Sequence, residues 1–197
     1  MLALHGLRVF NVEEIPTHGG SLRIYATHVE NQQIPKTNFV DAIKDAEQAS
    51  GLKNIETYLA FGEKVKETKR NLLAMLIEIK RHGKSVIGYG AHAEAHTLLN
   101  YCGIRTDFLD YLVDRNPQKQ GKFQAGTRLP IFSSERIQKT KPDYVLVLPW
   151  SIKIEIMKQL VSIDGWSARF IVPIPKLEIY DAKGNDISNT ILKEEVV

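Results

Sequence analysis

Hydrophobic and polar positions in the second half of the chain alternate between short apolar runs and stretches with helical spacing. Four runs predict strands: Lys84–Tyr89, Tyr111–Val113, Tyr144–Leu148 and Phe170–Val172. Between them, helices are expected through Leu98, Leu99 and Tyr101, in a short segment opened by Ser133 or Ser134, and from Ile152 to Val161. Right-handed crossovers between parallel strands place helices on both faces of a sheet. The pattern therefore predicts an α/β, Rossmann-like fold with a mostly parallel sheet.

Residues 7–29 show strand-like alternation around a turn-prone stretch. Leu7, Val9 and Val12 precede Pro16–Gly20, after which Leu22, Ile24 and Ala26 alternate with polar or amphipathic residues. The segment is expected to form a β-hairpin. Because an isolated hairpin is marginally stable, it should pack against something else, and we interpret it as the end of a larger domain.

Residues 36–83 have helical spacing, with Asn54 as a plausible N-cap and Gly83 as a stop after a basic turn. A helix over residues 55–82 would be about 40 Å long at ~1.5 Å per residue. We therefore expect three parts: a hairpin region over residues 1–35, a helical connector over 36–83, and a Rossmann-like domain over 84–197. The alternative is an ordinary helix that covers the core.

Composition restricts the class of protein without identifying it. Of 197 residues, 43% are hydrophobic and 25% are charged, and the formal net charge is +3. This small, dispersed charge argues against a nucleic-acid partner, and the apolar runs are too short for a membrane span. The single cysteine, Cys102, excludes an internal disulfide and fits a reducing compartment. We expect a cytoplasmic protein, with Cys102 as a small buried apolar residue.

A glycine-rich turn carries the first candidate site. Gly88, Gly90 and Ala93 match G-x-G-x-x-A directly after a predicted strand and before a predicted helix. Such a turn allows a phosphate or ribose to approach the backbone near Ala91, at the N-terminus of the helix. Asp114 ends the next strand, near the usual place of a ribose-binding carboxylate. The alternative is a tight structural turn, since the motif alone is weak.

Two loops that follow strands should line the same crevice, because ligands in parallel sheets sit outside the carboxyl ends of the strands. These are Asp114–Lys122 and Pro149–Ser151, in which Trp150 is a candidate to stack on a base or sugar. A solvated loop and a packed tryptophan are the alternatives. His92 and His96 lie four residues apart on the helix, but no third ligand is evident, so no metal site is predicted.

Several segments together resemble one family. IGYGAHAEAHTLLNYCGI, DYLVDRNPQKQGKFQAGTRLPIFSSERI, KPDYVLVLPWSIKIEIMKQL and FIVPIPKLEI, in this order, look like the C-terminal domain of the nucleotide-sugar C-methyltransferases. GLRVFNVEEIPTHGGSLRIYATH, residues 6–28, resembles the closing strands of the methyltransferase domain of the same family. The resemblance covers nearly the whole chain.

The resemblance implies a three-part enzyme that uses S-adenosylmethionine and acts on nucleotide-linked keto-deoxysugars. In that chemistry a general base removes a ring proton beside a carbonyl, and the enolate attacks the methyl group of the cofactor. The zinc module, the cofactor turn and the base would all lie upstream of Met1. We therefore expect the cofactor to be bound mainly by another domain, assign no catalytic residue here, and expect the chain alone to be inactive.

One departure from the family concerns the glycine turn. Relatives commonly continue it with proline and then alanine-lysine-glycine, whereas this chain reads His92–His96 with Glu94 at its centre. A carboxylate there disfavours a phosphate. Three interpretations stay open: a methyltransferase fragment that completes a sugar-nucleotide cleft, a self-standing nucleotide-binding module, and a scaffold without ligand. The partner is then a separate methyltransferase domain or subunit, or a second copy that pairs through the hairpin.

The hairpin loop carries the second candidate site. His18, Gly19, Gly20 and Ser21, with Arg23 after them, are expected to belong to the substrate cleft of the intact enzyme. The two glycines allow close approach of a ligand, and Arg23 is suited to bidentate contact with a phosphate. The alternative is a plain turn with a surface arginine in a salt bridge.

Overall fold

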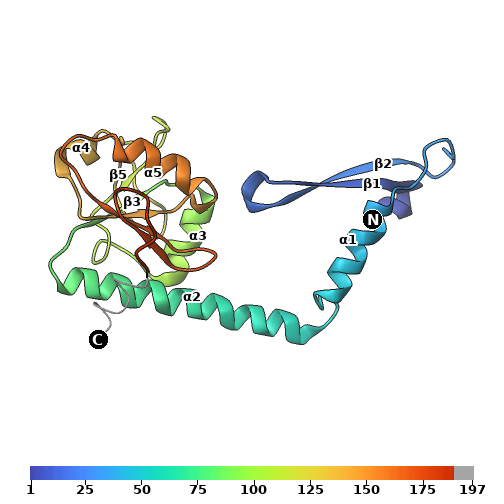
Figure 1. The fold of residues 1–197 in the computed structure, drawn as a ribbon, viewed down its shortest axis with the longest axis horizontal. Coiled ribbons are helices and arrows are strands. Elements are labelled where there is room, and N and C mark those ends of the chain that lie inside the picture. Colours follow the sequence, from blue (N-terminus) through green and yellow to red (C-terminus); the bar gives the residue numbers. More distant parts are fainter. Residues whose placement is uncertain (189–197) are drawn as a thin grey trace. The chain divides into compact units, whose positions relative to one another are not determined.

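The structure, a computed structural model, describes residues 1–188 and contains two units (Figure 1). The first unit is Met1–Glu63 and the second is Lys64–Val197, so the division falls inside helix α2 (Ile55–Arg81). Each unit is described by itself.

The second unit is built on a six-stranded sheet with strand order β5-β4-β3-β6-β7-β8. Its strands are β3 (Val86–Tyr89), β4 (Leu112–Val113), β5 (Ile131–Phe132), β6 (Tyr144–Val147), β7 (Arg169–Val172) and β8 (Glu178–Tyr180). All neighbouring pairs are parallel except β7 and β8, which are antiparallel. The chain starts in the middle of the sheet at β3, adds β4 on one side and returns to β6 on the other. The carboxyl ends of β3 and β6 therefore flank the switch point at which such sheets bind ligands.

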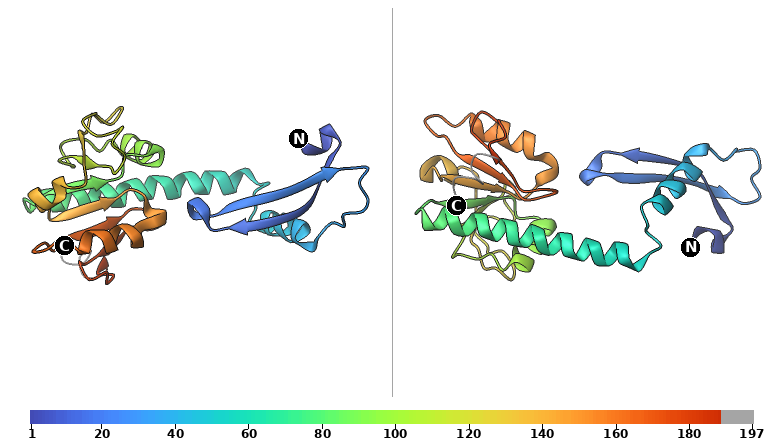
Figure 2. Two further views of the ribbon diagram at one scale, coloured as in Figure 1. Left: turned by 90° about the horizontal axis from the view of Figure 1, so that it is seen from above. Right: turned by 60° about the horizontal axis from the view of Figure 1, so that its bottom comes forward.

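Helices cover both faces of this sheet (Figures 1 and 2). They are the C-terminal part of α2, α3 (Ala93–Cys102), α4 (Arg136–Thr140), the short 3₁₀ helix η3 (Trp150–Ile152) and α5 (Lys153–Val161). Helices α2 and α3 pack on one face and α4 and α5 on the other. The strands supply alternate residues to the two cores, as a pleated strand must. In β6, for example, Leu146 faces α2 and α3, whereas Val145 and Val147 face α4 and α5.

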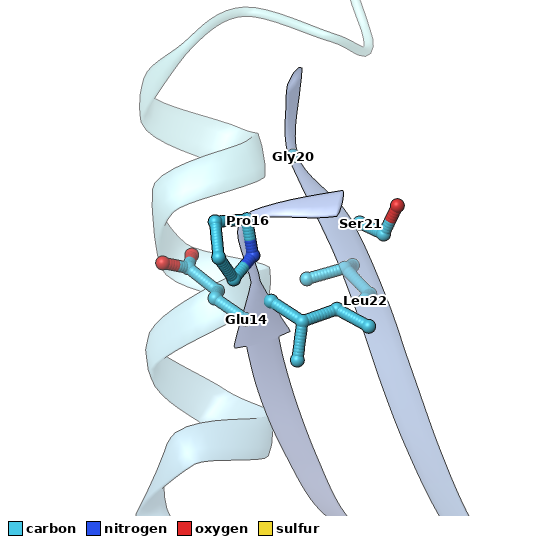
Figure 3. A pocket seen from close by; sticks show the side chains of 6 residues that line it. Glu14, Pro16, Gly20, Ser21 and Leu22 are labelled. Atoms are coloured by element: carbon cyan, nitrogen blue, oxygen red, sulfur yellow. The ribbon is translucent and has the colours of Figure 1, made fainter. Parts of the chain in front are cut away.

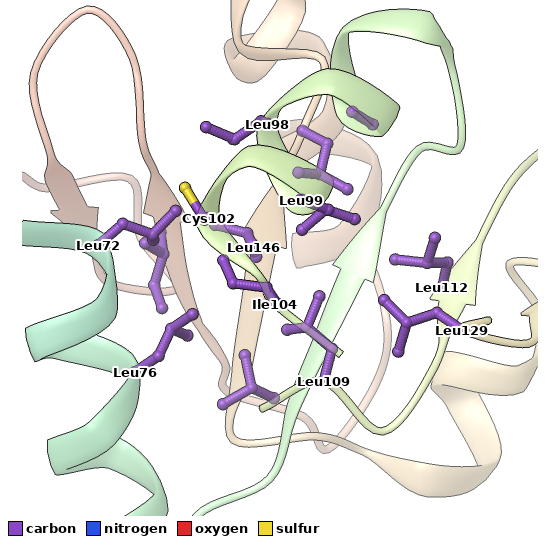
Figure 4. Packing of buried hydrophobic residues seen from close by; sticks show 14 of the residues in the cluster. Leu72, Leu76, Leu98, Leu99, Cys102, Ile104, Leu109, Leu112, Leu129 and Leu146 are labelled. Carbon is purple, nitrogen blue, oxygen red and sulfur yellow. The ribbon is translucent and has the colours of Figure 1, made fainter. Parts of the chain in front are cut away.

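The core beneath α2 and α3 is the larger of the two (Figure 4). The stripe of Leu72, Met75, Leu76 and Ile79 on α2 is almost completely buried, as its helical spacing requires. Helix α3 contributes Leu98, Leu99 and Cys102, which Figure 4 shows beside that helix. It ends at Gly103, whose φ of 76° is the left-handed conformation of a helix C-cap.

The first unit consists of a two-stranded ribbon and helices. Its elements are η1 (Leu2–His5), β1 (Leu7–Ile15), η2 (Thr17–Gly19), β2 (Ser21–His28) and α1 (Asn38–Ala49), followed by the start of α2. The antiparallel register places Glu13 opposite Arg23 and Val12 opposite Ile24, with an irregularity between Val9 and Asn11. Among residues 1–63, only Val40 is buried. The unit therefore has almost no closed core of its own.

The predicted fold class is confirmed: a mostly parallel sheet covered on both faces, preceded by a hairpin and a long helix. The expected helix over residues 55–82 is α2, which begins directly after Asn54. Two strands were not predicted. They are β5, with two residues, and β8, with three, and neither is marked by a separate apolar run in the way that β4 is.

Candidate functional site

The two glycines of the candidate turn are both in close contact with the protein itself. A Cβ atom on Gly88 would lie 2.4 Å from Cδ2 of Leu112 on the neighbouring strand. A Cβ atom on Gly90 would lie 2.7 Å from Cγ of Pro149, and its φ of 97° also favours glycine. The chain therefore needs glycine at position 88 in β3 to pack against β4, and at position 90 just after β3 to pack against the loop after β6.

Asp114 ties the turn to the loop that follows β4. Its Oδ2 accepts a hydrogen bond from the backbone N–H of Ala91 at 2.8 Å and one from Nζ of Lys119 at 3.0 Å. Its Oδ1 accepts from the N–H of Asn116 at 2.8 Å. Burial opposes the charge of the carboxylate, but these hydrogen bonds outweigh it and hold the pKa of Asp114 below its usual range. The backbone N–H of Ala91 at the turn is therefore already hydrogen-bonded to an anionic group of the chain itself, the carboxylate of Asp114.

His92 and Trp150 lie on the other side of the same turn. Their ring centroids are 6.5 Å apart in an edge-on arrangement, and Nδ1 of His92 is 3.3 Å from Oε2 of Glu94. Burial lowers the pKa of His92 below its usual range, although the charges of Glu94 and Asp114 act in the opposite direction. The half-buried Trp150 packs against the cores on both faces of the sheet.

His96 does not join His92 in a metal site. Its Nε2 accepts a hydrogen bond from the backbone N–H of Ala125 at 3.1 Å, which ties α3 to the loop before β5. Within residues 1–188, no group of three or more His, Cys, Asp or Glu side chains could hold a metal ion. Cys102 is buried, as expected, and burial raises the pKa of its thiol.

The second set of predicted residues lies at the tip of the hairpin in the first unit. His18, Gly19 and Gly20 all have positive φ, of 54°, 83° and 129°, and the Oγ of Ser21 donates to the carbonyl of Thr17. A Cβ atom on either glycine would meet open space, so the backbone conformation alone explains them. Figure 3 shows the hollow beside this tip, where Glu14, Pro16 and Leu22 line a cavity of about 650 Å³.

Arg23 pairs with Glu13 across the ribbon, at 3.0 Å between its guanidinium and Oε2. The hydroxyl of Tyr25 donates to the same oxygen at 2.8 Å. Contacts with Tyr25 and Glu13 raise the pKa of Arg23 above its usual value. The side chain is more than half exposed, so a ligand could still reach the free edge of the guanidinium.

The turn after β3 does not fit S-adenosylmethionine. A cofactor ribose needs an acceptor oxygen, and three of the roughly four acceptor sites of the Asp114 carboxylate already hold hydrogen bonds from the chain. The glycines leave no gap beside Leu112 and Pro149. The predicted residues Gly88, Gly90, Ala91, Asp114 and Trp150 are nevertheless brought together near the carboxyl edge of the sheet.

This combination of a glycine turn and a strand-terminal aspartate at a switch point belongs to the Rossmann-like class of domains. The family described as "C-methyltransferase C-terminal domain" matches residues 16–175. The chain belongs to this family. It is 30% identical over 179 residues to the C-methyltransferase NovU of Streptomyces niveus. The match covers 91% of this chain and 42% of that relative, so the chain spans less than half the length of the relative it matches.

Two contacts between side chains and distant parts of the chain have no signal in the sequence. Lys119 reaches Asp114 only because the loop after β4 folds back on itself, which spacing does not reveal. Lys69 and Tyr101 come from different helices, yet Nζ of Lys69 donates to the carbonyl of Tyr101 at 2.9 Å.

Among the described residues, no helix combines the length and the apolar character needed to cross a membrane.

Proposed function

We propose that this chain is the C-terminal part of an S-adenosylmethionine-dependent C-methyltransferase that acts on a nucleotide-linked keto-deoxysugar. In this proposal the chain helps to form the sugar-nucleotide cleft, and the methyl donor is bound by another domain. The misfit between the turn after β3 and the cofactor supports this division of labour.

The observation that carries the proposal is the incomplete first unit. A ribbon and a helix with Val40 as the buried residue cannot hide enough apolar surface to be stable alone. Leu22 and Ile24 on β2 are 46% and 55% exposed. Such a surface needs a covering partner, and the larger size of the relative supports a methyltransferase domain in that role. Pairing of two copies through the hairpin is the competing arrangement.

For the substrate, we propose two separate sets of contacts, each lying within one unit. His18, Gly19, Gly20, Ser21 and Arg23 form the first set. Gly88, Gly90, Ala91, Asp114 and Trp150 form the second. The guanidinium of Arg23 is more than half exposed and, once released from Glu13, can contact two phosphate oxygens. Trp150 offers an aromatic surface for a base or sugar.

The test uses this chain joined to, or co-expressed with, a methyltransferase domain of the family. Arg23→Lys and His18→Ala should weaken the affinity for the sugar nucleotide at least severalfold without changing the melting temperature. His28→Ala, an exposed position at the opposite end of β2, serves as the control. Unchanged kinetics in both variants would reduce the loop to a turn, and a fall in melting temperature alone would make its contacts structural.

A scaffold without a ligand is the second candidate function, and one observation favours it. The N–H of Ala91, which would face a phosphate, is already bonded to Asp114. If the chain contributes only contacts between domains, no variant at Asp114 or Trp150 will change the affinity for the sugar nucleotide.

A further inference from the structure

A cavity separate from the glycine turn lies between α2 and α3. It has a volume of about 410 Å³, and its lining comes from α2, α3, Trp150 and Ile174. Trp150 and Ile174 follow β6 and β7, so one end of the cavity lies near the carboxyl edge of the sheet. Pockets of a few hundred Å³ in this part of α/β folds commonly bind small molecules.

The interior of this cavity is apolar. Val65, Leu98 and Cys102 line it together with the rings of Tyr101 and Trp150. Burial keeps the thiol of Cys102 protonated by raising its pKa, so it acts as an apolar surface. The hydroxyl of Thr97 donates to the carbonyl of Ala93 on its own helix, and that of Thr68 donates to Lys64. A nucleobase inside would therefore find few partners for its polar edge.

Two charged residues, Lys69 and Glu94, line this cavity, and they differ in their hydrogen-bond and ion-pair partners. Lys69 donates to the carbonyl of Tyr101 at 2.9 Å and lies 5.2 Å from the centroid of the Tyr101 ring. Its charge is thus matched by the C-terminal end of α3. Glu94, at the other end of α3, has its carboxylate 3.3 Å from His92. Burial lowers the pKa of His92 and so disfavours its protonated form.

Glu94 is therefore a half-exposed carboxylate without a permanent cation beside it. Within residues 1–188, no lysine or arginine nitrogen lies within 4 Å of its oxygens. A carboxylate beside aromatic rings attracts organic cations, because the ring faces and the carboxylate both favour positive charge. The same carboxylate repels phosphates and other anions.

We propose that this cavity binds an organic cation with an apolar body, such as an alkyl- or arylammonium group. Glu94 supplies the opposite charge, Trp150 lies at the same end, and the apolar body occupies the space between α2 and α3. This site goes beyond the proposed sugar-nucleotide cleft and shares only Trp150 with it, so either proposal can fail without the other.

The test titrates the full chain with three small probes that share a benzyl or phenyl ring. They are benzyltrimethylammonium, neutral benzyl alcohol and anionic benzoate. Binding of each is measured by calorimetry and by changes in amide chemical shifts. The ammonium should bind most tightly, with shifts at Leu98, Tyr101 and Trp150. Benzoate should bind most weakly. Equal binding of all three, or no binding of any, would overturn the proposal.

Matched variants locate the charge. Glu94→Gln should weaken binding of the ammonium roughly tenfold and leave benzyl alcohol unchanged. Glu155→Gln is the control, because Glu155 is also an acidic residue in the first turn of its helix, α5. An equal loss in both variants, or no loss in Glu94→Gln, would contradict the role of Glu94.

A second pair of variants locates the body of the ligand. Thr97→Phe should fill the cavity and abolish binding of both the ammonium and the alcohol. Ile154→Phe places the same side chain on an exposed site of α5 and should leave binding unchanged. Retained binding in a folded Thr97→Phe variant would overturn the placement. If that variant fails to fold, the chemical-shift changes in the parent chain and the titration of Glu94→Gln still test where the ligand binds.

Discussion

At the scale of single residues, Asp114 is the side chain on which the candidate site depends most. It accepts hydrogen bonds from the N–H groups of Ala91 and Asn116 and from Lys119. Its side chain is 12% exposed. Asp114→Ala should therefore lower the free energy of unfolding at pH 7 by about 2–3 kcal/mol, because buried donors lose their acceptor. Denaturant unfolding followed by tryptophan fluorescence measures this. Asp110→Ala, which breaks an exposed pair with Lys80, should cost less than about 1 kcal/mol.

The same carboxylate gives a pH dependence with a defined sign. The pKa of Asp114 in the folded chain is below its usual value. Its contribution is therefore complete above the unfolded pKa of about 3.9 and is lost as the pH falls through the lower, folded pKa. The difference in stability between the parent and Asp114→Ala should shrink between about pH 4 and pH 2. A difference that stays constant over this range would contradict the assignment.

Gly88 gives a prediction about packing rather than charge. Gly88→Ala should destabilise the chain by about 1–3 kcal/mol, because the new methyl group would overlap Leu112. Combined with Leu112→Ala, it should cost less than the sum of the two single changes. Gly62→Ala is the contrasting variant. Its Cβ would meet open space on helix α2, so it should be neutral or stabilise by up to about 1 kcal/mol. Additive losses at Gly88 and Leu112 would exclude a direct clash.

At the scale of elements, the predicted strands are short apolar runs and the predicted helices are segments with helical spacing. The four predicted runs became β3, β4, β6 and β7, because buried parallel strands are continuously apolar. β5 and β8 are set by tertiary contacts and carry no local pattern of their own. The glycine turn was placed correctly between β3 and α3. That its glycines pack against Leu112 and Pro149 follows only from the folded arrangement.

The hairpin is the element that we expect to be least stable, because it is the least buried. With Val40 as the buried residue of the first unit, the amides of β1 and β2 should exchange early with solvent. The amides of β6 lie in the centre of the larger sheet and should exchange last. Hydrogen–deuterium exchange on a chain shown to be monomeric provides the comparison. Equal protection of β2 and β6 in the monomer would mean that the ribbon is stable without a partner.

At the scale of the whole molecule, the two units differ in how much of their apolar surface is buried. The second unit buries two cores, one on each face of its sheet, and has the size of an independent domain. The first unit has an exposed apolar ribbon instead. The second unit can therefore be stable by itself, whereas the first unit leaves the apolar side chains of its ribbon exposed. The relative NovU has more than twice the length that the match covers.

The last prediction concerns activity. Methyl transfer needs the donor and the acceptor carbon held about 3–3.5 Å apart, together with a base beside the acidic C–H. The turn after β3 does not fit the donor, and we assign no base to the described residues. The purified chain should therefore transfer no labelled methyl group from S-adenosylmethionine to a keto-deoxysugar nucleotide. Adding a methyltransferase domain of the family should restore transfer, and Arg23→Lys should then reduce it. Transfer by the chain alone that survives repurification would overturn this view and require a donor site within these residues.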